Sequence, residues 1–375
     1  MTDRSSGRIR DRIRRHKARA TARNRARSKR RRTTVVVAWS AAALVIVGGS
    51  GIGYVYVRLN GNIKDVDING QLGRDRPANV DNGSEDILIL GSDSRAGANR
   101  EYGHNAGDAR SDTAMIVHVY EGHRKAAVVS VPRDTLVDRP ACTDPKSRRP
   151  VPAQQLAMFN SAYEVGGPAC AVKTVEKMSG IRMDHYIEID FTGFKKVIDE
   201  LGGVKITTTR AINDPESHLK LAPGTHTLKG EQALGLVRTR KSVGDGSDLG
   251  RIQLQQAFIK ALIGQVRTIG VFSNPKKLYD VADTATRAIT PDSQLNTVQK
   301  LIGFAGGLKS LGAGDMKMIT LPVRYDPANR NRVLPVEPGA RQVWTALAHD
   351  RPIPASATRD SEGDRGNAHG VVRGG

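Results

Sequence analysis

Short apolar runs alternate with segments of helical spacing from about residue 85 onward. The runs DILILGS, TAMIVHVY and KAAVVSVPRD are continuous or β-branched and end at turn residues, which predicts buried strands. The segment NSAYEVGGPACAVKTVEKMSG carries Ala171, Val172, Val175 and Met178 at helical spacing, and Gly180 predicts the end of that helix. This mixture predicts an α/β protein.

The alternation continues toward the C-terminus. HYIEIDF and VKITTT predict strands on either side of TGFKKVIDELGG, an amphipathic helix that ends at Gly202 and Gly203. DLGRIQLQQAFIKALIGQV predicts a long helix, residues 274–310 accommodate two or three more, and DMKMITLP predicts a late strand. We therefore expect one α/β domain at 85–350, a polar linker at 58–84 before it and a disordered tail at 351–375.

The N-terminal segment has a different pattern. Thr33–Val57 is 25 residues long without a charge, enough to cross a bilayer as one transmembrane helix. Residues 1–32 hold 15 Lys/Arg and two Asp, so +13 of the formal net charge of +20 lies there. This distribution predicts a cytoplasmic basic tail, a single-pass membrane anchor and an extracytoplasmic body, and it argues against nucleic-acid binding. A cleaved signal peptide is the alternative interpretation.

Two cysteines, Cys142 and Cys170, lie in the expected external body. An even pair in an oxidising compartment predicts a disulfide, and two thiols without a His/Cys cluster make a poor zinc site. Two independent buried thiols remain the alternative.

Arginines gather where the predicted strands end. Several guanidinium groups together can neutralise a pyrophosphate, which each would bind through a bidentate fork. Ligands of α/β sheets bind at the carboxyl ends of strands, where these residues fall. For any single one, a solvated surface arginine or a structural ion pair is the alternative. The candidates are Arg95, Arg110, Arg133, Arg238, Arg240 and Arg251, of which Arg238 and Arg240 alternate as on an extended run.

Acidic residues accompany these arginines. Asp93 and Asp112 suit Mg²⁺, which takes one or two carboxylates together with substrate phosphate oxygens, unless they only pair with neighbouring arginines. Asp248 opens the long helix, either as an N-cap or as a reacting carboxylate. Gln255 lies four residues beyond Arg251, on the same helix face. No phosphate-binding loop, HExxH motif or dinucleotide fingerprint is present.

The ordered motifs ILILGSDSR, RSDTAMIVHV, VVSVPRDT, LKGEQALGLVRTRK and DGSDLGRIQLQQ resemble the LytR-CpsA-Psr family over about Asp86–Val266, and GGPAC looks like its actinobacterial members. The resemblance implies a three-layer α/β/α catalytic domain with a central mixed sheet, and an apolar pocket for a polyprenyl chain. It implies a phosphotransferase that moves a wall glycopolymer, such as a teichoic acid or arabinogalactan, from polyprenyl pyrophosphate to peptidoglycan with Mg²⁺ or Mn²⁺.

The same resemblance assigns roles. Asp93 and Asp112 match metal ligands, and Asp248 matches a candidate general base, with Arg238 and Arg251 also in the catalytic group. Pyrophosphate binding falls to Arg95, Arg110, Arg133, Arg238 and Arg251, with Arg240 beside them. We add Gln255 to this group because it shares a helix face with Arg251.

Two features depart from the family pattern. The loop AGANREYGHNAGDA is long and charged, and LGRIQLQQ replaces a commoner arginine-bearing run.

Two other functions compete with the transferase. They are a polyprenyl-pyrophosphate pyrophosphatase, in which water attacks, and a non-catalytic envelope protein that binds polyanions. A pure anion binder gains nothing from carboxylates beside the phosphate, which favours an enzyme.

Overall fold

The computed structural model describes residues 53–92, 111–244, 246–359, 361–365 and 370–374, without the side chains of Ser111, Asp112, Phe272, Asp364 and Arg365. Two compact units are present, Met1–Arg58 and Leu59–Gly375, and the second holds every element discussed below. The predicted basic tail and most of the predicted membrane span lie outside the described residues. Within the described residues, no helix combines the length and the apolar character that crossing a membrane requires.

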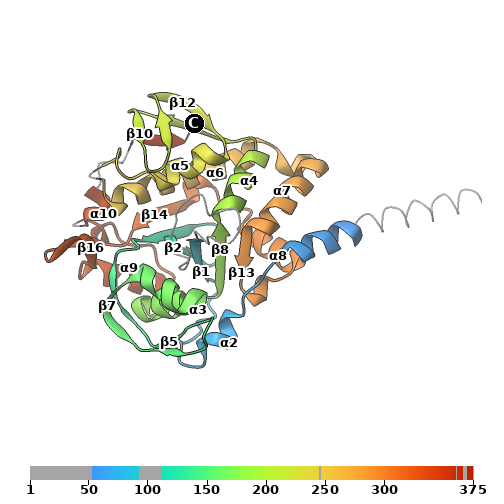
Figure 1. The fold of residues 1–375 in the computed structure, drawn as a ribbon. Coiled ribbons are helices and arrows are strands. Elements are labelled where there is room, and N and C mark those ends of the chain that lie inside the picture. Colours follow the sequence, from blue (N-terminus) through green and yellow to red (C-terminus); the bar gives the residue numbers. More distant parts are fainter. Residues whose placement is uncertain (1–52, 93–110, 245, 360, 366–369, 375) are drawn as a thin grey trace, which may run out of the picture. The chain divides into compact units, whose positions relative to one another are not determined.

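A six-stranded mixed sheet lies at the centre of the second unit, in the order β13-β8-β1-β2-β3-β14 (Figure 1). The pairs β1–β8 and β3–β14 are parallel, and β1–β2, β2–β3 and β8–β13 are antiparallel. The expected α/β class with a central mixed sheet is therefore confirmed. The strands are β1 Glu85–Ser92, β2 Ser111–Val119, β3 Ala126–Val131, β8 His185–Asp190, β13 Ile289–Pro291 and β14 Met316–Thr320.

Both faces of this sheet are apolar, which is why its strands are continuous hydrophobic runs. In β1, Leu88 and Leu90 point to one face and pack in the largest core cluster with residues of α3 and α9. Ile87 points to the other face, where Phe304 and Leu308 of α8 cover it. In Figure 1 α3 and α9 lie together on one side of the sheet. The helices are α2 Ile68–Leu72, α3 Phe159–Ser179, α4 Phe191–Glu200, α5 Gly230–Arg238, α6 Asp248–Thr268, α7 Pro275–Ala288, α8 Val298–Leu308, α9 Gly339–Ala348 and α10 Glu362–Arg365.

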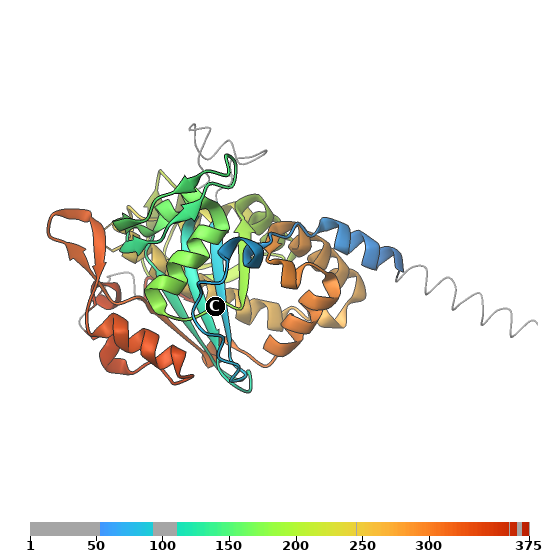
Figure 2. The ribbon, with the colours of Figure 1, turned by 90° about the horizontal axis from the view of Figure 1, so that it is seen from below.

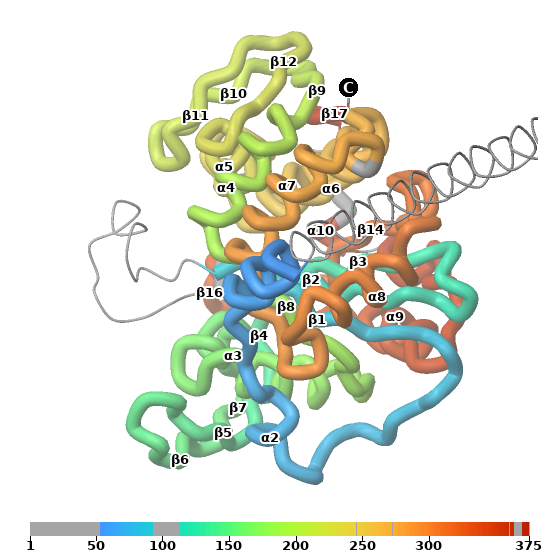
Figure 3. Tube along the Cα trace, turned by 90° about the vertical axis from the view of Figure 1, so that its right-hand side faces the viewer, coloured from blue at the N-terminus to red at the C-terminus, as the bar shows by residue number. Residues whose placement is uncertain are grey.

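Smaller sheets surround the centre. A three-stranded sheet, β12-β9-β17, packs with α4, α5 and α6 around a second apolar cluster (Figures 2 and 3). Among the described residues, four two-stranded ribbons accompany it. The remaining strands are β4 Leu136–Arg139, β5 Cys142–Thr143, β6 Pro150–Val151, β7 Gln154–Met158, β9 Val204–Thr208, β10 Ile212–Asp214, β11 Leu219–Leu221, β12 Gly224–Leu228, β15 Val323–Asp326, β16 Asn329–Pro335 and β17 Val372–Gly374. Short 3₁₀ turns occur at η2 Val271–Ser273, η3 Ser293–Leu295, η4 Ala313–Asp315 and η5 Ala355–Ala357.

The GGPAC stretch shapes the long helix α3. Gly167 adopts φ 62° and ψ −158°, a conformation open essentially to glycine alone, and the helix resumes at Pro168. Cys142 and Cys170 form the expected disulfide, with their Cα atoms 5.5 Å apart. A Cβ atom on Gly166 would lie 2.5 Å from the Cβ of Cys170, so the disulfide requires glycine at this position.

Two segments differ from the sequence expectation. Residues 58–84 were expected to be a linker, but α2 lies in them, and Ile68 and Leu72 are buried in the main core. The expectation of a disordered tail from residue 351 is wrong for its described residues. Ile353 and Ala357 are buried in the main core, η5 and α10 form between 355 and 365, and β17 pairs with β9 and buries Val372. The polar and glycine-rich composition of both segments hid these contributions, since each rests on a few scattered apolar residues.

Helix α6 is hydrogen-bonded to the edge of the central sheet at which the strands β3 and β14 end. The Gln256 side chain donates to the hydroxyl of Ser130 on β3 at 3.1 Å, and Gln253 donates to the carbonyl of Gly363 at 2.9 Å. Both glutamines are buried. These contacts hold the first turns of α6 beside the carboxyl end of β3.

Candidate active site

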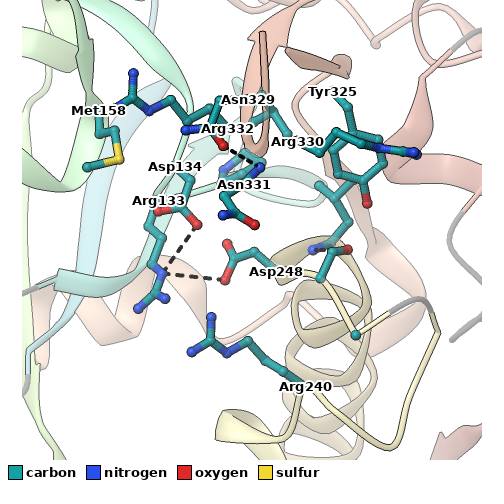
Figure 4. A pocket seen from close by; sticks show the side chains of 15 residues that line it. Arg133, Asp134, Met158, Arg240, Asp248, Tyr325, Asn329, Arg330, Asn331 and Arg332 are labelled. Carbon is teal, nitrogen blue, oxygen red and sulfur yellow. Dashed lines mark hydrogen bonds and ion pairs between the residues drawn. The ribbon is translucent and has the colours of Figure 1, made fainter. Parts of the chain in front are cut away.

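A cavity of about 450 Å³ opens at the carboxyl end of β3 (Figure 4). Five segments that are distant in sequence form its wall: the residues that follow β3, the end of β7, the loop after α5, the start of α6 and the β15–β16 hairpin. Its lining is Pro132, Arg133, Asp134, Met158, Arg240, Gly246, Ser247, Asp248, Leu249, Tyr325, Asn329, Arg330, Asn331, Arg332 and Val333.

Arg133 and Asp134 owe their position to the turn that ends β3. Pro132 cannot donate a backbone hydrogen bond, so the strand stops there. The Thr135 hydroxyl then donates to the carbonyl of Pro132 at 2.6 Å, and the carbonyl of Arg133 accepts from the backbone N–H of Asn160 at 3.0 Å. The turn therefore directs two charged side chains into the cavity from a fixed backbone.

Asp248 enters from the first turn of α6. The sequence left open that it is the N-cap, but Ser247 takes that role, accepting from the backbone N–H of Leu249. Asp248 forms a close ion pair with Arg251 and lies 3.8 Å from the Nε of Arg133. The side chains of Asp248 and Arg251 are 9% and 4% exposed, so the pair is almost fully removed from water.

Asp134 is a second carboxylate in the cavity, and sequence reasoning gave it no role. Its Oδ2 lies 3.6 Å from the Nε of Arg133. Burial raises the pKa of Asp134, and the charge of Asp248 raises it further against the opposing effect of Arg133, Arg251 and Arg240. Its position directly after Arg133 in PRDT was the available signal.

Arg240 is positioned by a buried carboxylate outside the cavity. Asp214, at the end of β10, accepts from the backbone N–H groups of Arg240 at 2.8 Å and Lys241 at 3.0 Å. Burial opposes the charged form, but the N–H donors outweigh it and lower the pKa of Asp214. The loop after α5 is therefore held so that the Arg240 side chain reaches the cavity (Figure 4).

Arg238 and Gln255 lie beside this cavity without lining it. The expectation of an extended run at Arg238 is wrong, because Arg238 is the last residue of α5. Its guanidinium carbon lies 5.7 Å from the ring centre of Phe191, a cation–π contact. Gln255 donates to the Thr113 hydroxyl and to the carbonyl of Val237, both at 2.9 Å. Gln255 thereby joins α6 to the start of β2, beside the predicted metal ligand at position 112.

Of the remaining predicted site residues, the structure describes only the backbone of Asp112. Asp93, Arg95 and Arg110 lie outside the described residues, as does the side chain of Asp112. The backbone of β2 places Asp112 at a register shift, because Gly91 pairs with Thr113 and Ser92 pairs with Ser111. Within the described side chains, no group of three or more His, Cys, Asp or Glu residues could hold a metal ion.

The site therefore combines one buried arginine–carboxylate pair, Asp248 with Arg251, with a cation-rich cavity at the carboxyl edge of an α/β sheet. Arginines gathered at this edge of an α/β sheet are the type of group with which proteins bind phosphate-containing anions. The LytR_cpsA_psr family profile matches residues 55–349, and the chain belongs to this family.

Two curated relatives are similar in sequence. The cell wall biosynthesis protein LcpA of Corynebacterium glutamicum is 31% identical over 299 residues, which is 73% of this chain and 57% of LcpA. The chain thus spans little more than half of LcpA. The polyisoprenyl-teichoic acid–peptidoglycan teichoic acid transferase TagT of Bacillus subtilis is 32% identical over 269 residues, which is 69% of this chain and 77% of TagT.

Solved structures share the fold. TagT with bound octaprenyl pyrophosphate matches with a TM-score of 0.51 and 25% identity, over 75% of this chain and 95% of that chain. A LytR-Csp2A-Psr enzyme from Actinomyces oris matches with a TM-score of 0.56 and 23% identity, over 76% of this chain and 95% of that chain. The second likeness concerns the fold alone.

Proposed function

We propose that this protein transfers a glycopolymer from a polyprenyl pyrophosphate carrier to peptidoglycan and forms a phosphodiester bond. The observation that carries the proposal is the cavity in which Arg133, Arg240 and Asp248 meet, on a chain of the LytR_cpsA_psr family. Two facts about TagT support it: the enzyme is named a teichoic acid transferase, and it has been solved with octaprenyl pyrophosphate. The particular glycopolymer stays unspecified in this proposal.

The reaction is a phosphoryl transfer. A hydroxyl oxygen of peptidoglycan attacks the phosphorus on the glycan side, and the bond from that phosphorus to the bridging oxygen breaks. Polyprenyl phosphate leaves with the electron pair. Arg133 and Arg240 bind the pyrophosphate oxygens and offset the charge that develops on the leaving group, assisted by Arg95, Arg110 and Arg238.

Asp248 accepts the proton of the attacking hydroxyl. Its carboxylate reaches the cavity wall, and Arg251 behind it keeps the side chain in one orientation. Gln255, two turns along the same helix, connects this helix to the start of β2. Helix α6 therefore holds Asp248, the proton acceptor, at a fixed distance from the start of β2, where the predicted metal ligand Asp112 lies.

A divalent cation, Mg²⁺ or Mn²⁺, belongs to the proposal. Asp93 and Asp112 would hold it, since carboxylates together with substrate phosphate oxygens are the ligands that Mg²⁺ prefers. When bound, the ion supplies positive charge to the pyrophosphate.

We also propose a membrane anchor at residues 33–57 with an extracytoplasmic body. The basic residues before this stretch support a cytoplasmic N-terminus, and the Cys142–Cys170 disulfide is typical of an oxidising compartment. A lipid-linked donor would then meet an enzyme that is held at the same membrane.

The experiment that tests donor binding uses the full chain in detergent micelles with octaprenyl pyrophosphate. Arg133→Ala should weaken binding by about 1.5–3 kcal/mol, the scale of a hydrogen bond between charged groups. The matched control is Arg324→Ala, since Arg324 is an exposed arginine of β15 that does not line the cavity. Equal affinity of wild type and Arg133→Ala would refute the binding role of the cavity.

A further inference from the structure

The β15–β16 hairpin contributes one whole wall of the cavity, and sequence reasoning gave it no function. Its base is part of the protein core: Val323 is 0% exposed and Val333 is 5% exposed. The backbone N–H of Val333 donates to the carbonyl of Asp134 at 3.2 Å, and Val333 forms a parallel bridge with Thr135. The hairpin is therefore attached to the same turn that presents Arg133 and Asp134.

The hairpin also supplies the excess positive charge of the cavity. Arg133 and Arg240 line it together with Asp134 and Asp248, whereas the hairpin adds Arg330 and Arg332 without adding a carboxylate. Arg133 lies within 3.6–3.8 Å of both aspartates. Within the described part of the chain, neither hairpin arginine forms an ion pair with a carboxylate.

Aromatic and amide groups accompany these two arginines. The guanidinium carbon of Arg330 lies 5.8 Å from the ring centre of Tyr325, which limits the conformations of its long side chain. Asn329 and Asn331 line the same wall, and the backbone N–H of Asn331 donates to the Asn329 side chain at 3.0 Å. Guanidinium, amide and aromatic groups together suit a sugar that carries an acidic substituent.

The position of Asp248 indicates which substrate this wall faces. In Figure 4 its side chain reaches into the cavity between Asn331 of the hairpin and Arg240, with Arg133 to one side. A carboxylate that removes the acceptor's proton lies between the phosphate-binding groups and the incoming hydroxyl. The hairpin is therefore on the acceptor side of the reacting centre.

We propose that the β15–β16 hairpin is a subsite for the peptidoglycan acceptor, in which Arg330 and Arg332 bind a carboxylate near the attacking sugar. Asn329 and Asn331 contact the sugar's hydroxyl groups. This inference rests on the proposed function and adds the recognition of the acceptor to it. The hairpin residues are specificity-determining and positioning groups, since they do not touch the transferring phosphorus.

The test compares the wild type with the Arg330→Gln/Arg332→Gln double variant of the full chain. The control is Arg324→Gln, the same substitution on the same hairpin at an exposed residue outside the cavity. Two acceptors are used, a peptidoglycan oligomer with free stem-peptide carboxylates and the same oligomer with those carboxylates amidated. For the free-acid acceptor, the double variant should raise KM at least about tenfold, and the control should leave it unchanged.

Three further readouts decide the assignment. Octaprenyl pyrophosphate should bind wild type and double variant equally. Amidation of the acceptor should raise KM for the wild type but not for the double variant, because the interacting charge is already lost. Thermal midpoints of the three proteins should agree, which excludes unfolding as the cause.

Several outcomes would overturn the acceptor assignment. An unchanged KM for the free-acid acceptor is one, and equal sensitivity of wild type and double variant to amidation is another. Weaker binding of a glycan-linked donor, with octaprenyl pyrophosphate binding intact, would instead assign the hairpin to the donor glycan. If the wild type binds no octaprenyl pyrophosphate, the proposed function itself fails. Direct titration of the free-acid oligomer would still test the hairpin separately.

Discussion

Replacing Asp248 by Asn removes one negative charge and keeps the shape of the side chain. The structure predicts two separate effects of this change. The first effect is on stability. Asp248 and Arg251 are 9% and 4% exposed, so Asn would leave the Arg251 guanidinium without its carboxylate in a nearly dry environment. Breaking a buried pair from one side costs about 3–5 kcal/mol. We expect about 3 kcal/mol, because the amide oxygen of Asn still accepts a hydrogen bond.

The second effect is on the chemical step. Loss of a general base lowers kcat by roughly 10²–10⁴-fold, which corresponds to about 3–5 kcal/mol of the activation barrier. Octaprenyl pyrophosphate affinity should not fall by a comparable amount, since the arginines that bind it remain. A lowered kcat with an intact donor site would distinguish a missing base from a collapsed cavity.

The assay combines thermal or chemical unfolding with steady-state transfer below the unfolding transition of the variant. Asp280→Asn is a matched control, because Asp280 pairs with Lys276 at 2.8 Å on the solvent-exposed surface of α7. This control should leave both the unfolding transition and kcat unchanged. Full kcat in a folded Asp248→Asn protein would refute the base assignment, and an unchanged unfolding free energy would refute the energetic value of the buried pair.

Three further predictions follow from other parts of the molecule. The Cys142→Ser/Cys170→Ser double variant should lose about 3–4 kcal/mol of unfolding free energy, because the disulfide closes a 28-residue separation; an unchanged denaturation midpoint would contradict this. Burial favours neutral His118, but its hydrogen bonds to Asp86 and Asp350, at 2.9 and 3.0 Å, outweigh burial and raise the pKa of His118. The stabilisation is therefore complete just below pH ~6.5 and is lost as pH rises through the higher folded-state pKa of His118. It is also lost in acid once Asp86, whose pKa burial raises, takes up a proton. His118→Gln should remove the loss at high pH, and identical pH profiles would show that the pair contributes nothing. EDTA should abolish transfer and Mg²⁺ or Mn²⁺ should restore it, whereas full activity in EDTA would remove the metal from the mechanism.

The sequence determined most of the central fold because its strands carry their own signal. The run from Ile87 to Leu90 is buried on both faces, and a continuous apolar run has no other stable location in an α/β protein. The end of α3 was equally visible, since Gly180 adopts the left-handed conformation that closes a helix.

Other elements gave no such signal. Arg238 and Arg240 alternate in LVRTR as on a strand, but Leu234 and Leu236 pack inward at the end of a helix, and tertiary contacts decided the conformation. The strand β17 has few apolar residues, and its pairing with β9 depends on a segment more than 160 positions away.

Some residues of the candidate site could likewise be predicted from the sequence, and others could not. Arg133 was identifiable because arginines gather where the predicted strands end, and Asp248 because its motif DGSDLGRIQLQQ resembles that of the family. The hairpin residues Arg330 and Arg332 were not, since DPANRNR has the composition of an exposed turn. Only the three-dimensional structure brings that turn to the cavity, because a bridge to Thr135 fixes its base.

The central claim is tested most directly by the bond that the enzyme makes. The full chain would be incubated with a polyprenyl-pyrophosphate-linked glycan and a peptidoglycan oligomer, and the product analysed by mass spectrometry and ³¹P NMR. The account predicts a phosphodiester between glycan and peptidoglycan, with polyprenyl phosphate released in equal amount. Release of polyprenyl phosphate together with a free glycan phosphate, and no peptidoglycan adduct, would contradict it and identify a pyrophosphatase.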